Sequence, residues 1–154
     1  MEATPKGYWL IKTEPTSYSI DDLQKDKVTD WGGIRNYQAR NFMTKDMKVG
    51  DRALFYHSSC EIPGIYGIAE IASGPLADPT QFDKKDSHFD PKATKEKPIW
   101  FMVRVKFIKK LKRPFTLYEI KASATLSKMV VAQQGSRLSI QPVSKTHFDE
   151  IVKG

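Results

Sequence analysis

The chain has 154 residues, 40% of them hydrophobic and 28% charged, and carries a formal net charge of +7. This length indicates one domain able to bury a core, and the single cysteine, Cys60, excludes an internal disulfide scaffold. No apolar run approaches a membrane span and the first residues lack the apolar segment of a signal peptide, so we expect a cytoplasmic protein, or a nuclear one if the source is eukaryotic.

Short strand and helix patterns alternate along the chain. Ser19 with Asp22 and Thr116 with Glu119 have the spacing of helix capping boxes. Four prolines and few large apolar residues predict a long loop over 73–98. In chain order the expected elements are a strand over 8–13, a helix from Ser19, a helix over 35–45, a hairpin of strands over 52–58 and 64–72, the loop, a strand over 99–108, a helix from Thr116, a strand over 137–143 and a helix over 146–153.

Alternation within the strands predicts which side chains share a face. Leu54 and Tyr56 should lie opposite Phe55 and His57, because neighbouring strand residues point to opposite sides. Strands mixed with short helices, without a repeated strand–helix–strand unit, indicate an α+β fold. A small mixed barrel flanked by helices is the natural way to close it.

The segment from Asp30 to Arg40, Asp-Trp-Gly-Gly-Ile-Arg-Asn-Tyr-Gln-Ala-Arg, is the most informative part of the chain. It joins an indole, a Gly-Gly pair and polar side chains able to grip a flat, polar ligand. Glycine allows backbone paths that other residues resist, and core segments seldom hold this many polar residues. The segment therefore predicts a binding site.

Eight short motifs are spread over almost the whole chain. They are Tyr-Trp-Leu-Ile-Lys-Thr-Glu-Pro at 8–15, Tyr-Ser-Ile-Asp-Asp-Leu at 18–23, Trp-Gly-Gly-Ile-Arg-Asn-Tyr-Gln-Ala-Arg-Asn at 31–41, Gly-Asp at 50–51, Phe-Tyr-His-Ser at 55–58, Gly-Ile-Tyr-Gly at 64–67, Pro-Ile-Trp at 98–100 and Arg-Leu-Ser-Ile-Gln-Pro-Val at 137–143. Together these motifs resemble those of EVE-domain proteins, in order and spacing, from residue 8 to about residue 150. The resemblance implies a single EVE domain over 1–154 with a core of about 8–152, and a PUA-like mixed β-barrel flanked by short helices. It also implies a ligand pocket lined by aromatic side chains and a link to modified DNA or RNA.

Aromatic rings are the first candidates for the pocket, because stacking on one ring contributes about 1–3 kcal/mol per base. The resemblance carries over Trp31, Tyr56 and Trp100. From the residues alone, Trp31 reads as a site residue beside Gly-Gly, whereas Trp9, within a hydrophobic strand, reads as core. Our central expectation is that Trp31 and Trp100 line one cleft.

Polar candidates for the same pocket have structural alternatives. Asn36 can pair with the edge of a base or cap the following helix, and Arg35 can bind a phosphate or pair with an internal acid. Lys12 and Glu14 can form a salt bridge, although the resemblance places their segment near the ligand cleft. The candidate set is Arg35, Asn36, His57, Ser58 and Ser139, with Lys12, Glu14 and Arg137 as further cleft residues.

Basic charge is concentrated between Lys92 and Arg113, where nine Lys or Arg residues accompany one Glu. Such a stretch attracts polyanions, or simply serves as a solvated surface. The expected phosphate-binding residues are Arg104, Lys106, Lys109, Lys110 and Arg113.

Signs of catalysis are missing from the sequence. His57 and Ser58 are strand neighbours that point apart, no nucleophile elbow or phosphate-binding glycine loop occurs, and the histidines and Cys60 lack metal-ligand spacing. We therefore expect no cofactor and no metal. The sequence favours a non-catalytic module that binds nucleic acid carrying a modified base, with a metabolite-binding protein as the alternative and a monomer as the default state.

Overall fold

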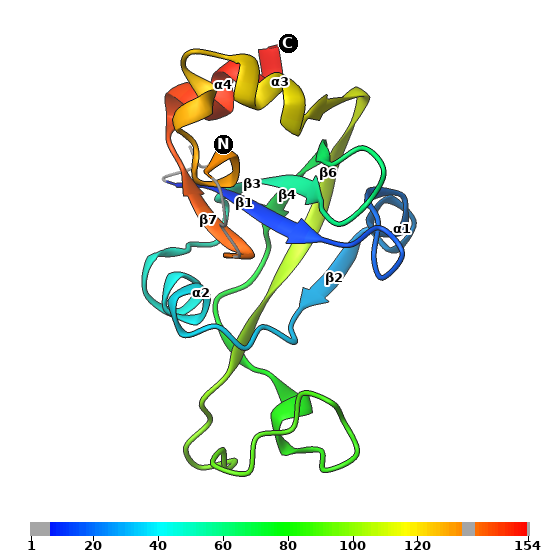
Figure 1. Ribbon diagram of the computed structural model, residues 1–154. Helices are drawn as coiled ribbons and strands as arrows, with labels where there is room; N and C mark the ends of the chain where they lie inside the picture. The colour runs from blue at the N-terminus through cyan, green and yellow to red at the C-terminus, as the bar shows by residue number, and fades with distance from the viewer. Residues whose placement is uncertain (1–6, 134–137, 154) are drawn as a thin grey trace.

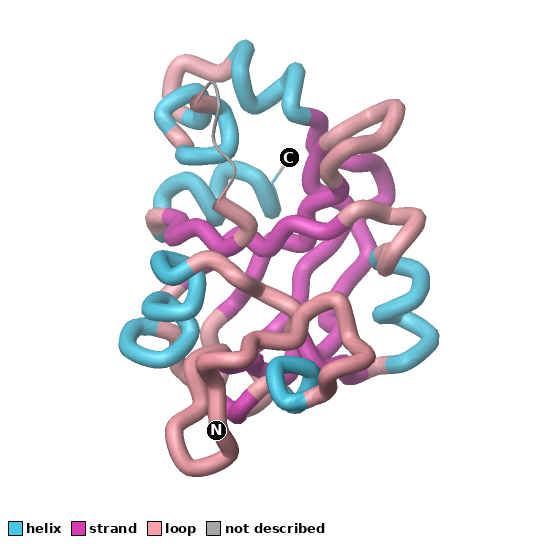
Figure 2. The backbone as a smooth tube through the Cα atoms, turned by 60° about the horizontal axis from the view of Figure 1, so that its bottom comes forward, coloured by secondary structure: helices cyan, strands magenta, loops and turns pink. Residues whose placement is uncertain are grey.

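One mixed sheet forms the centre of the molecule, and short helices lie around it (Figures 1 and 2). The structure is a computed structural model that describes residues 7–133 and 138–153. The sheet has the order β2-β6-β4-β3-β1-β7, with β5 paired to β6. The elements are β1 (Tyr8–Thr13), α1 (Ile20–Asp26), β2 (Val28–Trp31), α2 (Tyr37–Asn41), η1 (Phe42–Asp46), β3 (Arg52–His57), β4 (Gly64–Ile71), β5 (Leu76–Ala77), η2 (Pro79–Phe82), β6 (Phe101–Thr116), α3 (Leu117–Ala122), η3 (Leu126–Lys128), η4 (Val130–Ala132), β7 (Ile140–Val143) and α4 (Lys145–Lys153).

Both predicted capping boxes are confirmed. The Ser19 hydroxyl accepts from the backbone of Asp22 at 3.2 Å, and the Asp22 carboxylate accepts from the backbone of Ser19 at 2.9 Å. Thr116 and Glu119 make the same reciprocal pair at the start of α3. Each box pairs backbone N–H groups that the first helical turn leaves without partners.

The two faces of the sheet are buried in separate apolar clusters. Phe55 packs in one cluster with Trp31 and Val103, whereas Leu54 and Tyr56 pack in the other. The predicted alternation within β3 is therefore confirmed. Helices α3 and α4 cover the second face, to which Ile120, Phe148 and Ile151 belong. Fully burying one large apolar side chain stabilises a fold by about 1.5–3 kcal/mol.

Three elements differ from the sequence-based expectation. The structure adds β2, a four-residue strand that pairs antiparallel with β6. Strand β6 continues past the predicted end at residue 108 to Thr116, and its pairing with β4 shifts register at Ile65/Gly67 and at Ile68/Ala69. The expected helix over 35–45 begins only at Tyr37, since Asn36 is extended, and its second half is a π-helical turn.

Residues 72–100, here called the arm, connect β4 to β6 and project from one end of the molecule (Figure 1). The sequence predicted an irregular loop over most of this range. The arm instead contains β5 and η2, and Gln81 within it is fully buried. The Gln81 side chain accepts from the backbone of Ile99 and Trp100 and donates to the carbonyl oxygens of Asp78 and Trp100. The arm therefore has secondary structure and internal hydrogen bonds of its own.

The sheet is mixed, because the pair β1–β3 is parallel and the other strand pairs are antiparallel. Strand β1 lies inside the sheet, between parallel β3 and the antiparallel edge strand β7. Strands β2 and β7 end the hydrogen-bonded order, and no pairing between described residues joins these two edges. The structure thus shows an open sheet where the sequence predicted a closed barrel.

Candidate functional site

A cavity of about 500 Å³ lies between the two open edges of the sheet. Ligand sites of small molecules commonly have volumes of about 300–1,000 Å³. The cavity, here called the pocket, is lined by the ends of β1 and β2 and by Ser139, which directly precedes β7. Its lining is Lys12, Thr13, Tyr18, Thr29, Asp30, Trp31, Gly32, Gly33, Ile34, Arg35, Asn36 and Ser139.

Trp31 forms one wall of the pocket and is 8% exposed. Its ring meets Phe55 and Tyr18 edge-on, with centroid separations of 5.4 and 6.2 Å. Within the described residues no hydrogen bond is formed by its indole Nε1, and none of their side-chain nitrogens or oxygens is both fully buried and unpaired. The Trp31 N–H therefore keeps accessible surface and is a donor available to a ligand.

The other two indoles differ from Trp31 because the N–H of each has an acceptor. Trp9 donates its N–H to Asp51 at 3.0 Å, and Trp100 donates to Asp90 at 2.8 Å. Trp9 lies in the core, as predicted, at 4% exposure. Among the three indoles, only Trp31 has an N–H that no described residue accepts.

Polar groups from three parts of the chain surround the opening beside Trp31. The backbone N–H of Lys12 donates to the carbonyl of Ser139 at 2.9 Å, which ties β1 to the approach of β7. Thr13 donates its hydroxyl to the carbonyl of Tyr18 at 3.0 Å. Burial lowers the pKa of Lys12. Burial also raises the pKa of Tyr18 to about 12, with a smaller contribution from the nearby Asp26. Tyr18 is therefore a neutral phenol at physiological pH.

Asn36 caps the following helix, which was one of its two predicted roles, and it also lines the pocket. Its side-chain oxygen accepts from the backbone of Ala39 at 2.9 Å and caps α2. Its amide nitrogen has no hydrogen-bond partner in the described part of the chain, so Asn36 can cap the helix and still donate to a ligand.

The Gly32–Gly33 pair, here called the joint, is held by Asp78 of the arm. Asp78 is 1% exposed and accepts from the backbone N–H of Gly33 at 2.6 Å. Gly33 has φ of +74°, and a β-carbon there would lie 3.2 Å from Nε2 of His88. This left-handed backbone requires glycine, so the joint turns sharply between Trp31 and the polar residues that follow.

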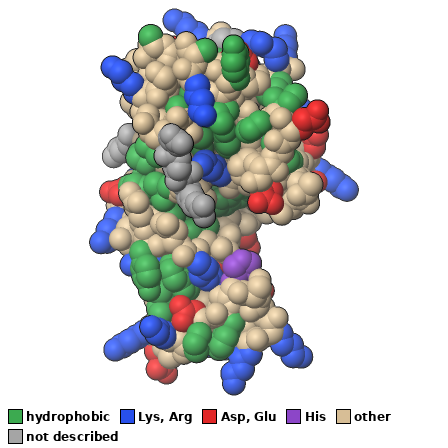
Figure 3. Space-filling model, in the orientation of Figure 1, with side chains coloured by type: hydrophobic (Ala, Val, Ile, Leu, Met, Phe, Trp, Pro, Cys, Tyr) green, Lys and Arg blue, Asp and Glu red, His purple; other side chains and the backbone are tan. Residues whose placement is uncertain are grey.

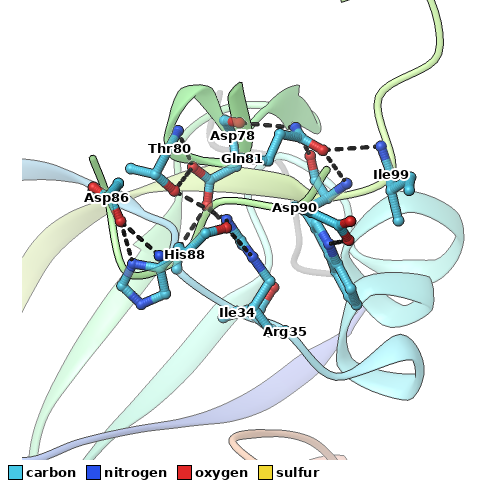
Figure 4. Close-up of polar contacts among 11 residues, drawn as sticks. Ile34, Arg35, Asp78, Thr80, Gln81, Asp86, His88, Asp90 and Ile99 are labelled. Atoms are coloured by element: carbon cyan, nitrogen blue, oxygen red, sulfur yellow. Dashed lines mark hydrogen bonds and ion pairs between the residues drawn. The ribbon is translucent and has the colours of Figure 1, made fainter. Parts of the chain in front are cut away.

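Arg35 points from the pocket wall toward the arm (Figure 4). Its guanidinium lies 3.2 Å from Asp78 and also donates to Thr80 and to the carbonyl of His88. Burial raises the pKa of Asp78, but hydrogen bonds from Thr80, Gly33 and Arg35 outweigh this effect and hold it below its usual value. Of the two predicted roles for Arg35, the structure shows pairing with an internal acid.

Trp100 does not line the pocket. Its ring lies 4.8 Å from that of Tyr37, and the guanidinium of Arg35 stands 5.4 Å from it. The N–H of Trp100 is held by Asp90, within the arm. Trp31 lines the pocket and Trp100 does not, in contrast to the expected single cleft, although Arg35 borders both. Tyr37, which the sequence analysis did not select, is the aromatic neighbour of Trp100 and is 57% exposed.

The β3 candidates also lie outside the pocket lining. Tyr56 is 3% exposed in the apolar cluster of the opposite face. His57 accepts from the backbone of Ile20 at 3.1 Å and stacks on Tyr66, and burial lowers its pKa. Ser58 donates to the carbonyl of Thr13, and the carbonyl of Glu14 accepts from Tyr18 in a turn. Strand pairing and helix packing explain these positions. Arg137 lies outside the described residues.

The basic residues of β6 are divided among different parts of the surface. Arg104 pairs with Asp30 at 3.0 Å, Lys110 with Asp21 at 2.7 Å and Arg113 with Glu119 at 3.4 Å. Lys and Arg side chains are spread over both body and arm in Figure 3. None of the five predicted phosphate-binding residues lines the pocket. Arg104 adjoins the pocket through its ion pair with Asp30, which is one of the lining residues.

Sequence reasoning missed Thr13, Tyr18 and Thr29 as pocket residues. Thr29 belongs to β2, a strand of four residues that is too short and too polar to show a strand pattern in the sequence. Residues 7–133 and 138–153 contain no group of three or more His, Cys, Asp or Glu side chains able to hold a metal ion. The same residues include no helix long and apolar enough to cross a membrane.

Comparisons with known proteins agree on one family. The sequence model of the EVE domain matches residues 7–154. Thymocyte nuclear protein 1 of Gallus gallus is 43% identical, over 94% of this chain and 67% of the relative. A structure from Leishmania major is 48% identical with a TM-score of 0.89, covering 96% of this chain and 92% of the other. The human THYN1 protein in complex with 5-methylcytosine-containing DNA is 37% identical with a TM-score of 0.86, covering 96% of both chains.

Proposed function

Because the chain belongs to the EVE domain family, we propose that it binds nucleic acid carrying a modified base and holds that base in the pocket. The observation that carries the proposal is the Trp31 N–H, a donor without a described protein acceptor in a cavity large enough for a nucleotide. The role is recognition without catalysis. We also propose that the sheet is an incompletely closed, PUA-like barrel, with the pocket at the gap between its unpaired edge strands β2 and β7.

The human relative indicates which ligand to consider first. That protein forms a complex with DNA containing 5-methylcytosine, and this chain covers 96% of it at 37% identity. We propose 5-methylcytosine in DNA as the first candidate ligand here, with modified RNA as the second. The added methyl group is apolar surface that an aromatic wall such as Trp31 favours. The name thymocyte nuclear protein, borne by several relatives, favours a nuclear location if the source is eukaryotic.

The polar residues of the pocket match the needs of an extracted base. Trp31 Nε1 and the Asn36 amide supply donors, and hydroxyl groups such as that of Ser139 can donate or accept. Extracting a base costs a few kcal/mol. One aromatic contact contributes about 1–3 kcal/mol and each hydrogen bond about 0.5–1.5 kcal/mol. Trp31 and two hydrogen bonds therefore suffice to offset extraction.

The predicted site residues divide into two roles under this proposal. Trp31, Asn36, Ser139 and Lys12 contact the ligand from the pocket lining. Arg35 holds the wall through Asp78 instead of binding a phosphate. The remaining candidates act on the framework: Trp100 within the arm, Tyr56 and His57 within β3, and Ser58 directly after that strand.

The test compares duplexes that differ only by one 5-methylcytosine, at a fixed salt concentration of about 0.15 M. Trp31→Phe removes the N–H and should weaken binding of the modified duplex about two- to tenfold, and Trp31→Ala should weaken it further. Tyr118→Ala, which removes a ring 82% exposed on α3, is the control and should change nothing. Equal affinity of the unaltered protein for both duplexes, unchanged in Trp31→Ala, would reject the base pocket. A metabolite competing for the pocket would then become the leading explanation.

A further inference from the structure

A second concave surface lies at the end of β6 that is far from the arm. It is a groove of about 440 Å³ between the end of β6 and α4, here called the basic groove. Leu111, Phe115 and Val152 form an apolar floor that continues the second core cluster. The full lining is Lys109, Leu111, Lys112, Arg113, Pro114, Phe115, Ile151, Val152 and Lys153.

The basic groove is lined by four cationic residues and no acidic one. Arg113 has a partner at its edge, Glu119 at 3.4 Å. Lys109, Lys112 and Lys153 lie within 4 Å of no acidic oxygen in residues 7–133 and 138–153. Cations brought together in one concavity repel one another and concentrate a positive potential there. An anionic ligand that spans several of them removes this repulsion.

The position of the groove relative to the pocket favours a long polyanion. Trp31 pairs with Val103 of β6, and Lys112 lies nine residues further along the same strand. A strand rises about 3.3 Å per residue, so the two sites are separated along β6 by at most about 30 Å. Strand β6 runs from the arm to the α3 and α4 end of the molecule (Figure 1). A duplex advances about 3.4 Å per base pair, so about nine base pairs cover this span.

We propose that the basic groove binds the sugar–phosphate backbone of the same duplex whose modified base enters the pocket, about nine base pairs away. This inference rests on the proposed function and adds a second, sequence-independent contact to it. Lys109, Lys112 and Lys153 contact phosphates, while the apolar floor faces the sugars. The groove therefore raises affinity for long duplexes, and the pocket alone distinguishes the modified base.

The experiment uses two duplexes with a central 5-methylcytosine and their unmodified counterparts, with flanks of about 4 and about 14 base pairs on each side. The variant Lys109→Gln/Lys112→Gln/Lys153→Gln removes three charges and leaves Arg113 with Glu119. The control, Lys84→Gln/Lys85→Gln/Lys95→Gln, removes three exposed charges from the arm. Binding is measured across a series of salt concentrations.

The groove variant should bind the long duplexes about tenfold more weakly at about 0.1 M salt, with a salt slope smaller by about 2–3. It should bind the short duplexes as the unaltered protein does, and its preference for the modified base should be unchanged at both lengths. Equal losses on short and long duplexes, equal losses in the arm control, or no loss at all would overturn the proposal. Failure of the base pocket would show differently, as no preference for the modified base in the unaltered protein.

Discussion

Trp31 in the pocket and Trp100 in the arm have almost the same burial but different surroundings. They are 8% and 5% exposed, and each contacts neighbouring aromatic rings. Trp100 donates its N–H to Asp90, whereas no described residue accepts from Trp31. Burial therefore does not distinguish an indole whose N–H is used within the fold from one whose N–H has no described acceptor, which is the indole that we propose contacts the ligand. The hydrogen bonding of the polar edge makes that distinction.

The pocket and the arm meet at Asp78, and substituting this residue should have the largest effect on stability. Asp78→Ala leaves the N–H of Gly33 and the guanidinium of Arg35 without their buried acceptor. Removing one member of a buried pair costs about 3–5 kcal/mol, so we expect a fall of that size in the free energy of unfolding, measured with urea. Asp83→Ala, an exposed acid of the same arm, should cost far less. An unchanged urea midpoint in Asp78→Ala would show that the arm does not hold the joint.

Lowering the pH should also remove the contribution of Asp78 to the free energy of unfolding. The pKa of Asp78 is lower in the folded protein, so its stabilising effect is fully present above the ordinary aspartate pKa of about 3.9. That effect is lost as pH falls through the lower folded pKa. The difference in unfolding free energy between the unaltered protein and Asp78→Ala should therefore shrink below about pH 4. A difference that stays constant to the lowest measurable pH would contradict this role.

Substituting each indole by phenylalanine should separate the two regions. Trp100→Phe removes the hydrogen bond to Asp90 and should lower Tm by about 2–4 °C, with the preference for a modified base retained. Trp31→Phe should change Tm less and reduce that preference, because its N–H has no described partner to lose. Thermal unfolding and duplex binding of both variants check the pair. Equal behaviour of the two variants would remove the distinction drawn between the indoles.

The sequence predicted local features well and long-range placements poorly, and the indoles show why. Capping at Ser19 and Thr116 depends on residues three positions away, so spacing alone was sufficient. Trp31 could be selected because the joint and the polar residues follow it directly. The position of Trp100 depends on Asp90 and on Tyr37, which is 63 residues earlier in the chain (100 − 37). No periodicity encodes such a contact.

The predictions for the β3 and β6 residues differed from the structure for another reason. The alternation in β3 gave the correct faces but could not show that α1 covers His57 or that the second cluster covers Tyr56. In β6, the sequence showed neither the continuation past residue 108 nor the register shift beside Ile68. The charge run therefore indicated one basic surface, whereas the structure places Lys110 beside Asp21 and Lys109 in the basic groove.

The titration of His57 should have the smallest of the predicted effects on stability. Burial lowers its pKa, so the folded protein binds a proton there less readily than the unfolded chain does. The resulting stability is fully present above the ordinary histidine pKa of about 6.5 and declines as pH falls toward the lower folded pKa. We expect a modest fall in Tm between about pH 7 and pH 5 that His57→Gln, which keeps an acceptor for the Ile20 N–H, makes shallower. An equally steep fall in that variant would assign the effect to other groups.

The most direct test of the pocket is the indole N–H region of a ¹H–¹⁵N NMR spectrum. The three tryptophans give separate indole signals, and the signal absent from Trp31→Phe identifies Trp31. On titration with a 5-methylcytosine duplex, the Trp31 signal should shift as its N–H gains an acceptor, more than with the unmodified duplex. The Trp9 and Trp100 signals, already paired with Asp51 and Asp90, should stay nearly fixed. A stationary Trp31 signal at saturation, with the protein bound, would contradict the account.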